Sequence, residues 1–222
     1  MMKPLQNAYS IYRWKIAQWF ELRWWKRYLK KKDKAQYLDW KRNYWQQLLK
    51  MVADVLVIHP DLKVCDLGCG PAGIFIALPD NSITAVDPLL EVYEKQTGFF
   101  LPADYPNTRF VCNTLEEFTT ATPFDLVFCM NCINHVQDME KGFEQLKAVC
   151  ADGGTLILSI DAHNYSFFKH LFRFIPGDVL HPHQYDLAGY QTFLEKQGFK
   201  ILKTELLKKE FFFGHWVVVA SK

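Results

Sequence analysis

The sequence predicts an α/β fold in which a helical segment precedes a mostly parallel sheet. After residue 60, short apolar segments alternate with helical ones, which is typical of parallel strands with helices on both faces of a sheet. The last two apolar segments are joined by only a few residues, which permits an antiparallel pair and excludes a crossover helix. The first 58 residues show helical periodicity instead. We therefore expect a helical cap over residues 1–58 and a sheet domain over residues 59–222.

The cap is expected to contain two helices, over residues 8–30 and 35–57. In the second, apolar positions such as Tyr37, Tyr44 and Leu48 recur at a spacing of three to four, with Lys41 the only polar residue in the stripe. The charged run "KKKDK" between the two helices breaks the apolar pattern and indicates an exposed turn.

The sheet domain is expected to contain seven strands and five helical stretches. The predicted strands are residues 62–68, 82–88, 108–113, 124–130, 154–161, 199–211 and 213–221. The predicted helical stretches are residues 71–78, 89–97, 114–119, 138–150 and 186–197. Residues 162–186 remain as an insertion rich in Phe and His between the fifth strand and the last helix.

Charge and tryptophan divide the chain at the same place. Residues 1–50 hold 13 Lys and Arg against three acidic residues, and six of the seven Trp. The remainder holds 13 basic and 21 acidic residues. The cap is thus a basic, Trp-rich module in front of an acidic body.

Composition excludes several classes of protein. Half of the 222 residues are hydrophobic, enough for one sizeable core. The first 30 residues contain no continuous apolar run, so we expect neither a signal peptide nor a transmembrane helix. The six cysteines are scattered through predicted strands and turns, which indicates a reduced, cytoplasmic protein.

A glycine-rich turn after the first strand predicts a nucleotide site. Gly68 and Gly70 let a ligand approach the main chain, and Asp87, at the end of the next strand, can accept hydrogen bonds from both hydroxyls of a ribose. With Gly73, the turn also fits the spacing of dinucleotide-binding proteins. Asp66 favours another ligand, because an acid beside the turn repels a pyrophosphate and suits an ammonium or sulfonium group. The alternative is an ordinary tight turn with an N-capping aspartate.

Five segments in order resemble the motifs of class I S-adenosylmethionine-dependent methyltransferases. They are "VCDLGCGPAG", "AVDP", "RFVCNTLEEF", "FDLVFCMNCINHV" and "LKAVCADGGTLILS", within residues 62–161. The third and fourth most resemble the ubiquinone-biosynthesis O-methyltransferases and related small-molecule enzymes. The resemblance implies a Rossmann-like, seven-stranded, mostly parallel sheet with an antiparallel last strand, and S-adenosylmethionine as cofactor.

The resemblance also implies ten cofactor-binding positions in the sheet domain and two further candidates in the cap. The methionine end would be held by Asp66, Gly68 and Gly70, and the ribose by Asp87. The adenine would be flanked by Pro88, with Asn113, Thr114 and Leu115 near its edge. Met130 and Asn131 would line the pocket at the end of the fourth strand, and Arg42 or Tyr44 would reach the cofactor carboxylate from the cap.

Methyl transfer from a sulfonium is an in-line displacement, which needs positioning and, for a hydroxyl acceptor, removal of a proton. The candidate bases are His135, after the fourth strand, and His181 and His183 in the insertion. A structural role remains the alternative for each. We expect no metal, because the related O-methyltransferases carry metal-associated glutamates where this chain has Asn131 and Asn134.

The expected activity is methyl transfer to an oxygen, or in second place a nitrogen or carbon, of a small, partly apolar or aromatic acceptor. The alternatives are a tRNA or protein methyltransferase, and a cofactor-binding partner subunit without catalysis. The basic cap has three interpretations beside a dimer interface: a lid over the site, a surface that meets an anionic membrane, or an RNA-binding surface. The acidic body and the lack of a known RNA-binding motif argue against nucleic acid.

Cys129, Cys132 and His135 share a spacing that suggests a zinc or redox site. Cys129 belongs to a predicted strand and the other two to the loop after it. A zinc site needs a fourth ligand and both thiols on one side, and a redox pair needs a helix N-terminus. We therefore interpret the spacing as accidental.

Overall fold

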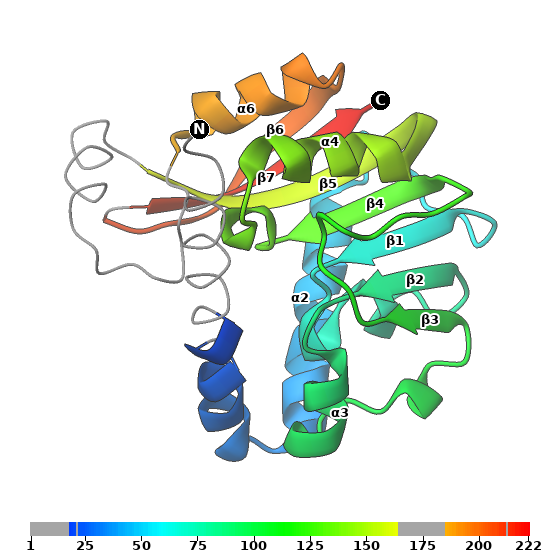
Figure 1. Cartoon of the computed structure of the whole chain (residues 1–222), viewed down its shortest axis with the longest axis vertical. Coiled ribbons are helices and arrows are strands. Elements are labelled where there is room, and N and C mark those ends of the chain that lie inside the picture. The colour runs from blue at the N-terminus through cyan, green and yellow to red at the C-terminus, as the bar shows by residue number, and fades with distance from the viewer. Residues whose placement is uncertain (1–17, 21, 164–184, 212) are drawn as a thin grey trace, which may run out of the picture.

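The computed structural model describes residues 18–20, 22–163, 185–211 and 213–222, and its centre is a seven-stranded sheet (Figure 1). The strand order is β3-β2-β1-β4-β5-β7-β6. The strands are β1 (Lys63–Leu67), β2 (Ser82–Val86), β3 (Thr108–Val111), β4 (Phe124–Met130), β5 (Cys150–His163), β6 (Lys200–Lys209) and β7 (Phe213–Ser221).

The predicted sheet class is confirmed. The pairs β1–β2, β1–β4, β2–β3 and β4–β5 are parallel, whereas β7 is antiparallel to both β5 and β6. The chain passes β5, forms β6 at the edge and returns through β7 into the gap between them. The carboxyl ends of β1, β2 and β4 therefore meet along one rim, which is where ligands bind in sheets of this kind.

Helices cover both faces of the sheet (Figure 1). Residues 18–20 and 22–30 are helical, and α2 (Lys34–Val52) and α3 (Leu90–Thr97) pack with them on one face. On the other face lie α4 (Met139–Val149) and α6 (Leu187–Lys196). Aspartates cap the N-termini of α2, α4 and α6, each accepting a backbone N–H three residues on.

The N-terminal helices share a core with the sheet. Trp45 of α2 is 3% exposed, packs edge-on against Phe128 of β4 and donates its indole N–H to the Ala72 carbonyl at 3.1 Å. Leu29 of the first helix joins the same cluster. This packing fixes α2 above the glycine turn.

Two predicted helices are wrong. Residues 71–78 form two short 3₁₀ turns, Gly70–Ala72 and Ile74–Ile76, because Gly73 adopts an extended backbone between them. Residues 114–119 form a single turn. No helix in the described part of the chain has both the length and the hydropathy needed to cross a membrane.

Candidate functional site

The glycine turn after β1 admits no larger side chain at its first glycine. Gly68 has φ +71°, and a Cβ there would stand 2.4 Å from Sγ of Cys132. Gly70 also has a positive φ, +57°. The turn is tied to the next strand, because the Gly68 N–H donates to the Val86 carbonyl at 2.8 Å. Main chain therefore lines the site here, which allows a ligand to approach the backbone closely.

Asp66 is a buried carboxylate at the floor of the site. Its side chain is 1% exposed, and its Oδ2 accepts the Ile74 N–H at 2.8 Å. Burial, aided by the charge of Asp87, raises the pKa of Asp66 to about 7, although the Ile74 hydrogen bond and Lys41 oppose this. A ligand cation in contact with this carboxylate would offset the cost of its ionisation.

Asp87 follows β2 and faces the glycine turn. Its Oδ2 accepts the Gly70 N–H at 2.9 Å and its Oδ1 accepts the Leu89 N–H at 2.8 Å. Burial raises the pKa of Asp87 to about 6 against these two hydrogen bonds. Each oxygen keeps a lone pair for a further donor, such as a hydroxyl.

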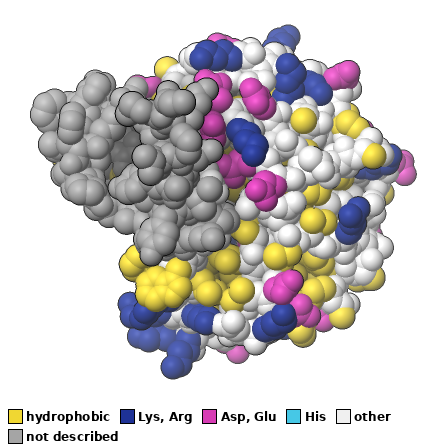
Figure 2. Space-filling view, in the orientation of Figure 1, with side chains coloured by type: hydrophobic (Ala, Val, Ile, Leu, Met, Phe, Trp, Pro, Cys, Tyr) yellow, Lys and Arg dark blue, Asp and Glu magenta, His cyan; other side chains and the backbone are white. Residues whose placement is uncertain are grey.

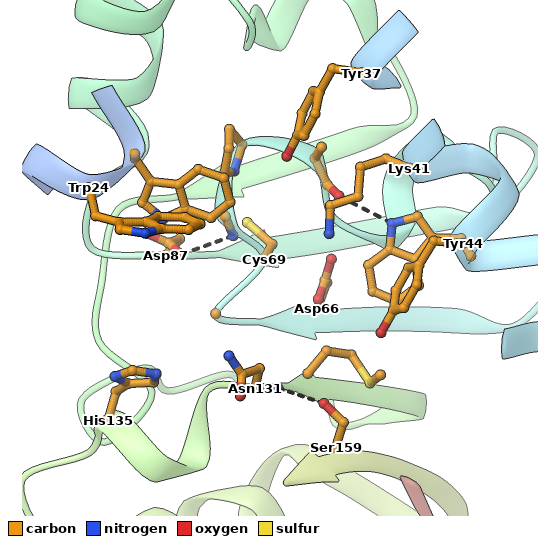
Figure 3. A pocket seen from close by; sticks show the side chains of 17 residues that line it. Trp24, Tyr37, Lys41, Tyr44, Asp66, Cys69, Asp87, Asn131, His135 and Ser159 are labelled. Carbon is orange, nitrogen blue, oxygen red and sulfur yellow. Dashed lines mark hydrogen bonds between the residues drawn. The ribbon is translucent and has the colours of Figure 1, made fainter. Parts of the chain in front are cut away.

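A cavity of about 430 Å³ lies between the rim of the sheet and the N-terminal helices (Figure 3). The sheet side contributes Asp66, Asp87, Asn131 and Ser159. The helical side is aromatic and comprises Trp24, Trp25, Tyr37, Tyr44 and Trp45. The volume falls in the range usual for small-molecule sites.

Lys41 projects from α2 into this cavity toward Asp66 (Figure 3). Burial lowers the pKa of the Lys41 ammonium, and the charge of Asp66 acts in the opposite direction. Of the two residues suggested for the cofactor carboxylate, Tyr44 lines the cavity, whereas Arg42 pairs with Asp39 at 2.7 Å on the outer surface. The cavity thus holds the Asp66 carboxylate beside the Lys41 ammonium, in addition to the second carboxylate of Asp87, and the first two groups complement the two charges of a free amino acid.

A smaller cavity of about 60 Å³ adjoins the first. Asp87, Gly68, Asn131 and His135 line both. Pro88, Thr114 and Leu115 line only the smaller one, together with Glu116, which the sequence analysis did not select. Asn113 lines neither cavity, and its Oδ1 accepts the Thr114 N–H. The shared residues place Asp87 between a polar, charged compartment and a narrow one.

The end of β4 carries strained backbone. Met130 lines the larger cavity, and Asn131 after it has φ +50°, the one positive value among the described residues that are not glycine. The Asn131 N–H donates to Oγ of Ser159 at 2.8 Å. Backbone held in this region persists only where its surroundings fix it, and such positions cluster at functional sites.

His135 is the predicted base that the structure places at the site. It ends a 3₁₀ turn, Ile133–His135, and lines both cavities (Figure 3). His181 and His183 lie outside the described residues. The neighbouring Asn134 is 1% exposed and accepts a hydrogen bond from the Tyr190 hydroxyl, so it faces the core.

His215 of β7 is a histidine that the sequence analysis did not select. His215 Nδ1 contacts Oδ1 of Asp161, which is its partner in the β5–β7 register. Asp161 is two residues beyond Ser159 on β5, and its charge contributes to the raised pKa of Tyr44 in the cavity wall. No sequence signal joins residues 54 positions apart; only the strand pairing does.

The described part of the chain contains no group of three or more His, Cys, Asp or Glu placed to hold a metal ion. Cys129 is fully buried within β4, whereas Cys132 packs against Gly68. The two thiols thus belong to different surroundings.

Comparisons with known proteins agree on one family. A family model described as a methyltransferase domain matches residues 22–204. The chain is 26% identical over 169 residues to the tRNA U34 carboxymethyltransferase of Campylobacter concisus, covering 70% of this chain and 56% of that protein. It is 24% identical over 171 residues to the ubiquinone biosynthesis O-methyltransferase of Coxiella burnetii, covering 66% and 71%. The chain thus spans little more than half of the first relative.

Solved structures share the fold. Magnesium protoporphyrin IX methyltransferase from Synechocystis PCC 6803, with S-adenosylhomocysteine bound, superposes with a TM-score of 0.57 at 21% identity, covering 82% of this chain and 83% of that one. The YcgJ protein of Bacillus subtilis gives 0.64 at 15% identity, covering 80% and 99%.

Proposed function

We propose that the chain, which belongs to the methyltransferase-domain family and is an S-adenosylmethionine-dependent methyltransferase, methylates an oxygen of a small, partly apolar or aromatic molecule. The observation that carries the choice of acceptor is the larger cavity, whose helical wall is aromatic except for Lys41 and whose lining includes His135. Aromatic walls favour apolar and aromatic ligands.

The residues of the two cavities fit the cofactor. Asp66 and Lys41 suit the ammonium and the carboxylate of its methionine end. Asp87, which lines both cavities, suits the ribose that would lie between the methionine end and the narrow cavity. Gly68 leaves main chain exposed where a Cβ has no room. When bound, the cofactor supplies an electrophilic methyl group on a sulfonium.

The chain's own residues would do three things. Trp24, Trp25 and Tyr44 line the larger cavity and would limit the access of water, which would strengthen the charge interactions inside it. Asp66, Asp87 and Lys41 would fix the cofactor, so that an acceptor need only align with it. His135 would accept the proton of the acceptor hydroxyl through a ring nitrogen as the new bond forms.

The test is a transfer assay with cofactor labelled in its methyl group. The purified protein would be offered phenols and catechols, amines of similar size, and bulk tRNA. Label on phenolic oxygen is the expected result, with His135→Gln lowering kcat by about a hundredfold or more and leaving the affinity for S-adenosylhomocysteine within about twofold. Label on amines or tRNA alone would overturn the choice of acceptor.

A tRNA acceptor is the second candidate, and the cationic first helix favours it. Residues 18–34 hold seven Lys and Arg and two acidic residues. In that case label would enter tRNA, and the affinity for tRNA would fall steeply with salt.

A further inference from the structure

The first helix turns a cationic, aromatic face to the solvent. Positions 22, 25 and 29 face the core, and at about 100° per residue the next positions round the helix form two outward stripes. We call these stripes the basic aromatic face: Trp19, Phe20, Arg23, Lys26, Arg27 and Lys30, all exposed. Figure 2 shows a yellow patch flanked by dark blue where the first helix lies in Figure 1.

Exposed aromatic rings are concentrated on the cap. Of the five exposed Trp and Phe side chains among the described residues, Trp19, Phe20, Trp24 and Trp40 belong to it, at 46–54% exposure. Only Phe211 lies elsewhere. Large rings kept in water at this density mark an interaction surface.

The cations of the face are available to a partner. Lys26, Arg27 and Lys30 have no ion pair with any described residue, and the guanidinium of Arg23 lies 4.6 Å from the centre of the Trp19 ring. Cations beside Trp are typical of helices that lie in the headgroup region of a membrane, where the ring enters the interface and the charge meets lipid phosphate.

We propose that the basic aromatic face docks the protein on an anionic lipid surface. The face is one side of a helix whose other side is packed in the core, so it meets a plane without unfolding anything. Its charge is opposite to that of residues 51–222, which hold 21 acidic against 13 basic residues. The acidic body therefore orients the docking, because anionic lipid repels it.

Docking would also bring the active-site cavity to the interface. Trp24 is 51% exposed at the border of the face, stacks on Tyr28 with ring centres 4.8 Å apart, and lines the larger cavity. An acceptor dissolved in the bilayer would then enter from the headgroup layer. This consequence rests on the proposed function, whereas the docking itself does not.

The experiment is cosedimentation with vesicles of phosphatidylcholine containing about a quarter phosphatidylglycerol, against phosphatidylcholine alone. We expect binding only to the anionic vesicles and a loss of affinity with added salt. The triple variant K26Q/R27Q/K30Q should bind on the order of a hundredfold more weakly. W19S/F20S should bind about tenfold more weakly, and its residual binding should be more sensitive to salt.

The matched control is K141Q/K147Q/K200Q, which removes the same charge from exposed positions on α4 and at the start of β6. It should bind vesicles as the parent does, and circular dichroism should show all variants folded. Equal losses in both triple variants, no vesicle binding by the parent, or binding of bulk tRNA in place of vesicles would each overturn the proposal. Because cosedimentation with vesicles uses neither cofactor nor acceptor, its outcome is separate from that of the transfer assay.

Discussion

Asp66 makes cofactor binding depend on pH. Its pKa of about 7 in the free protein means that it is largely protonated in mild acid, whereas an ammonium partner requires the ionised form. We expect the affinity for S-adenosylhomocysteine to fall as pH drops below about 7, by about tenfold per pH unit well below it. Calorimetric titrations across pH would measure this, and in Asp66→Asn the slope should shrink to the part due to Asp87.

The same burial gives a stability trend of opposite sign. The folded protein holds the Asp66 proton up to about pH 7, whereas an unfolded aspartate releases it near 3.8. Between these values the folded state binds more protons, so this group stabilises the ligand-free protein as pH falls through that window. Thermal unfolding of wild type and Asp66→Asn, compared at both ends of the window, would reveal the difference; identical trends would contradict it.

The Lys41 ammonium is expected to bind the carboxylate at the methionine end of the cofactor. Lys41→Met should weaken binding of S-adenosylhomocysteine by about tenfold or more. It should leave binding of 5′-methylthioadenosine unchanged, because that ligand lacks the amino-acid end. Arg42→Met is the matched control, since Arg42 pairs with Asp39 outside the cavity. Equal losses for both ligands would assign Lys41 a structural role.

A comparison of Gly68 with Gly98 distinguishes the cost of backbone strain from that of a steric clash. Gly68 and Gly98 have φ of +71° and +69°, but a Cβ at Gly98 meets nothing within 4 Å, whereas one at Gly68 meets Cys132. Gly98→Ala should lower the free energy of unfolding by about 1 kcal/mol. Gly68→Ala should lower it by at least about 1 kcal/mol more and also weaken cofactor binding. Urea unfolding of both variants compares them directly, and equal costs would contradict the steric account.

At the scale of elements, Trp45 holds α2 on the glycine turn. Trp45→Phe removes the hydrogen bond to the Ala72 carbonyl and leaves a gap in the core, so we expect a loss of about 1–3 kcal/mol in the free energy of unfolding. Trp40→Phe, on the exposed side of the same helix, should change it by less than about 0.5 kcal/mol. Comparable losses of unfolding free energy in the two variants would show that the buried Trp45 contributes no more to stability than the exposed Trp40.

The sequence predicted helices and strands correctly where a segment showed a single periodicity, either strand alternation or helical spacing. All seven strands, α2 and α4 lie where alternation and helical spacing predicted them. The α-helix predicted over residues 71–78 does not form, because the Ile74 N–H donates to buried Asp66 and Gly73 is extended, which divides the stretch into two 3₁₀ turns. The early end of α2 has a distant cause too: Lys203 of β6 donates to the Met51 carbonyl at 2.7 Å and pairs with Asp54.

At the scale of the whole molecule, the sequence predicted the residues at the strand ends and missed those that other elements bring to them. Asp66, Gly68 and Asp87 follow from local turns. In the sequence, Lys41 appeared only as a polar exception in an apolar stripe. The cavity beneath α2 explains this exception, because the Lys41 side chain lines it. The Asp161–His215 contact depends on the antiparallel register of β5 and β7, which short-range pattern does not encode.

S-adenosylmethionine is expected to bind at the rim of the sheet between β1 and β2. Calorimetric titration of S-adenosylhomocysteine into wild type, Asp87→Asn and Asp80→Ala tests it most directly, because the two aspartates flank β2 at its opposite ends. Wild type and Asp80→Ala should bind with equal affinity, and Asp87→Asn should bind on the order of a hundredfold more weakly while still folded. Unaltered affinity in Asp87→Asn, or no binding by wild type, would rule out this cofactor site.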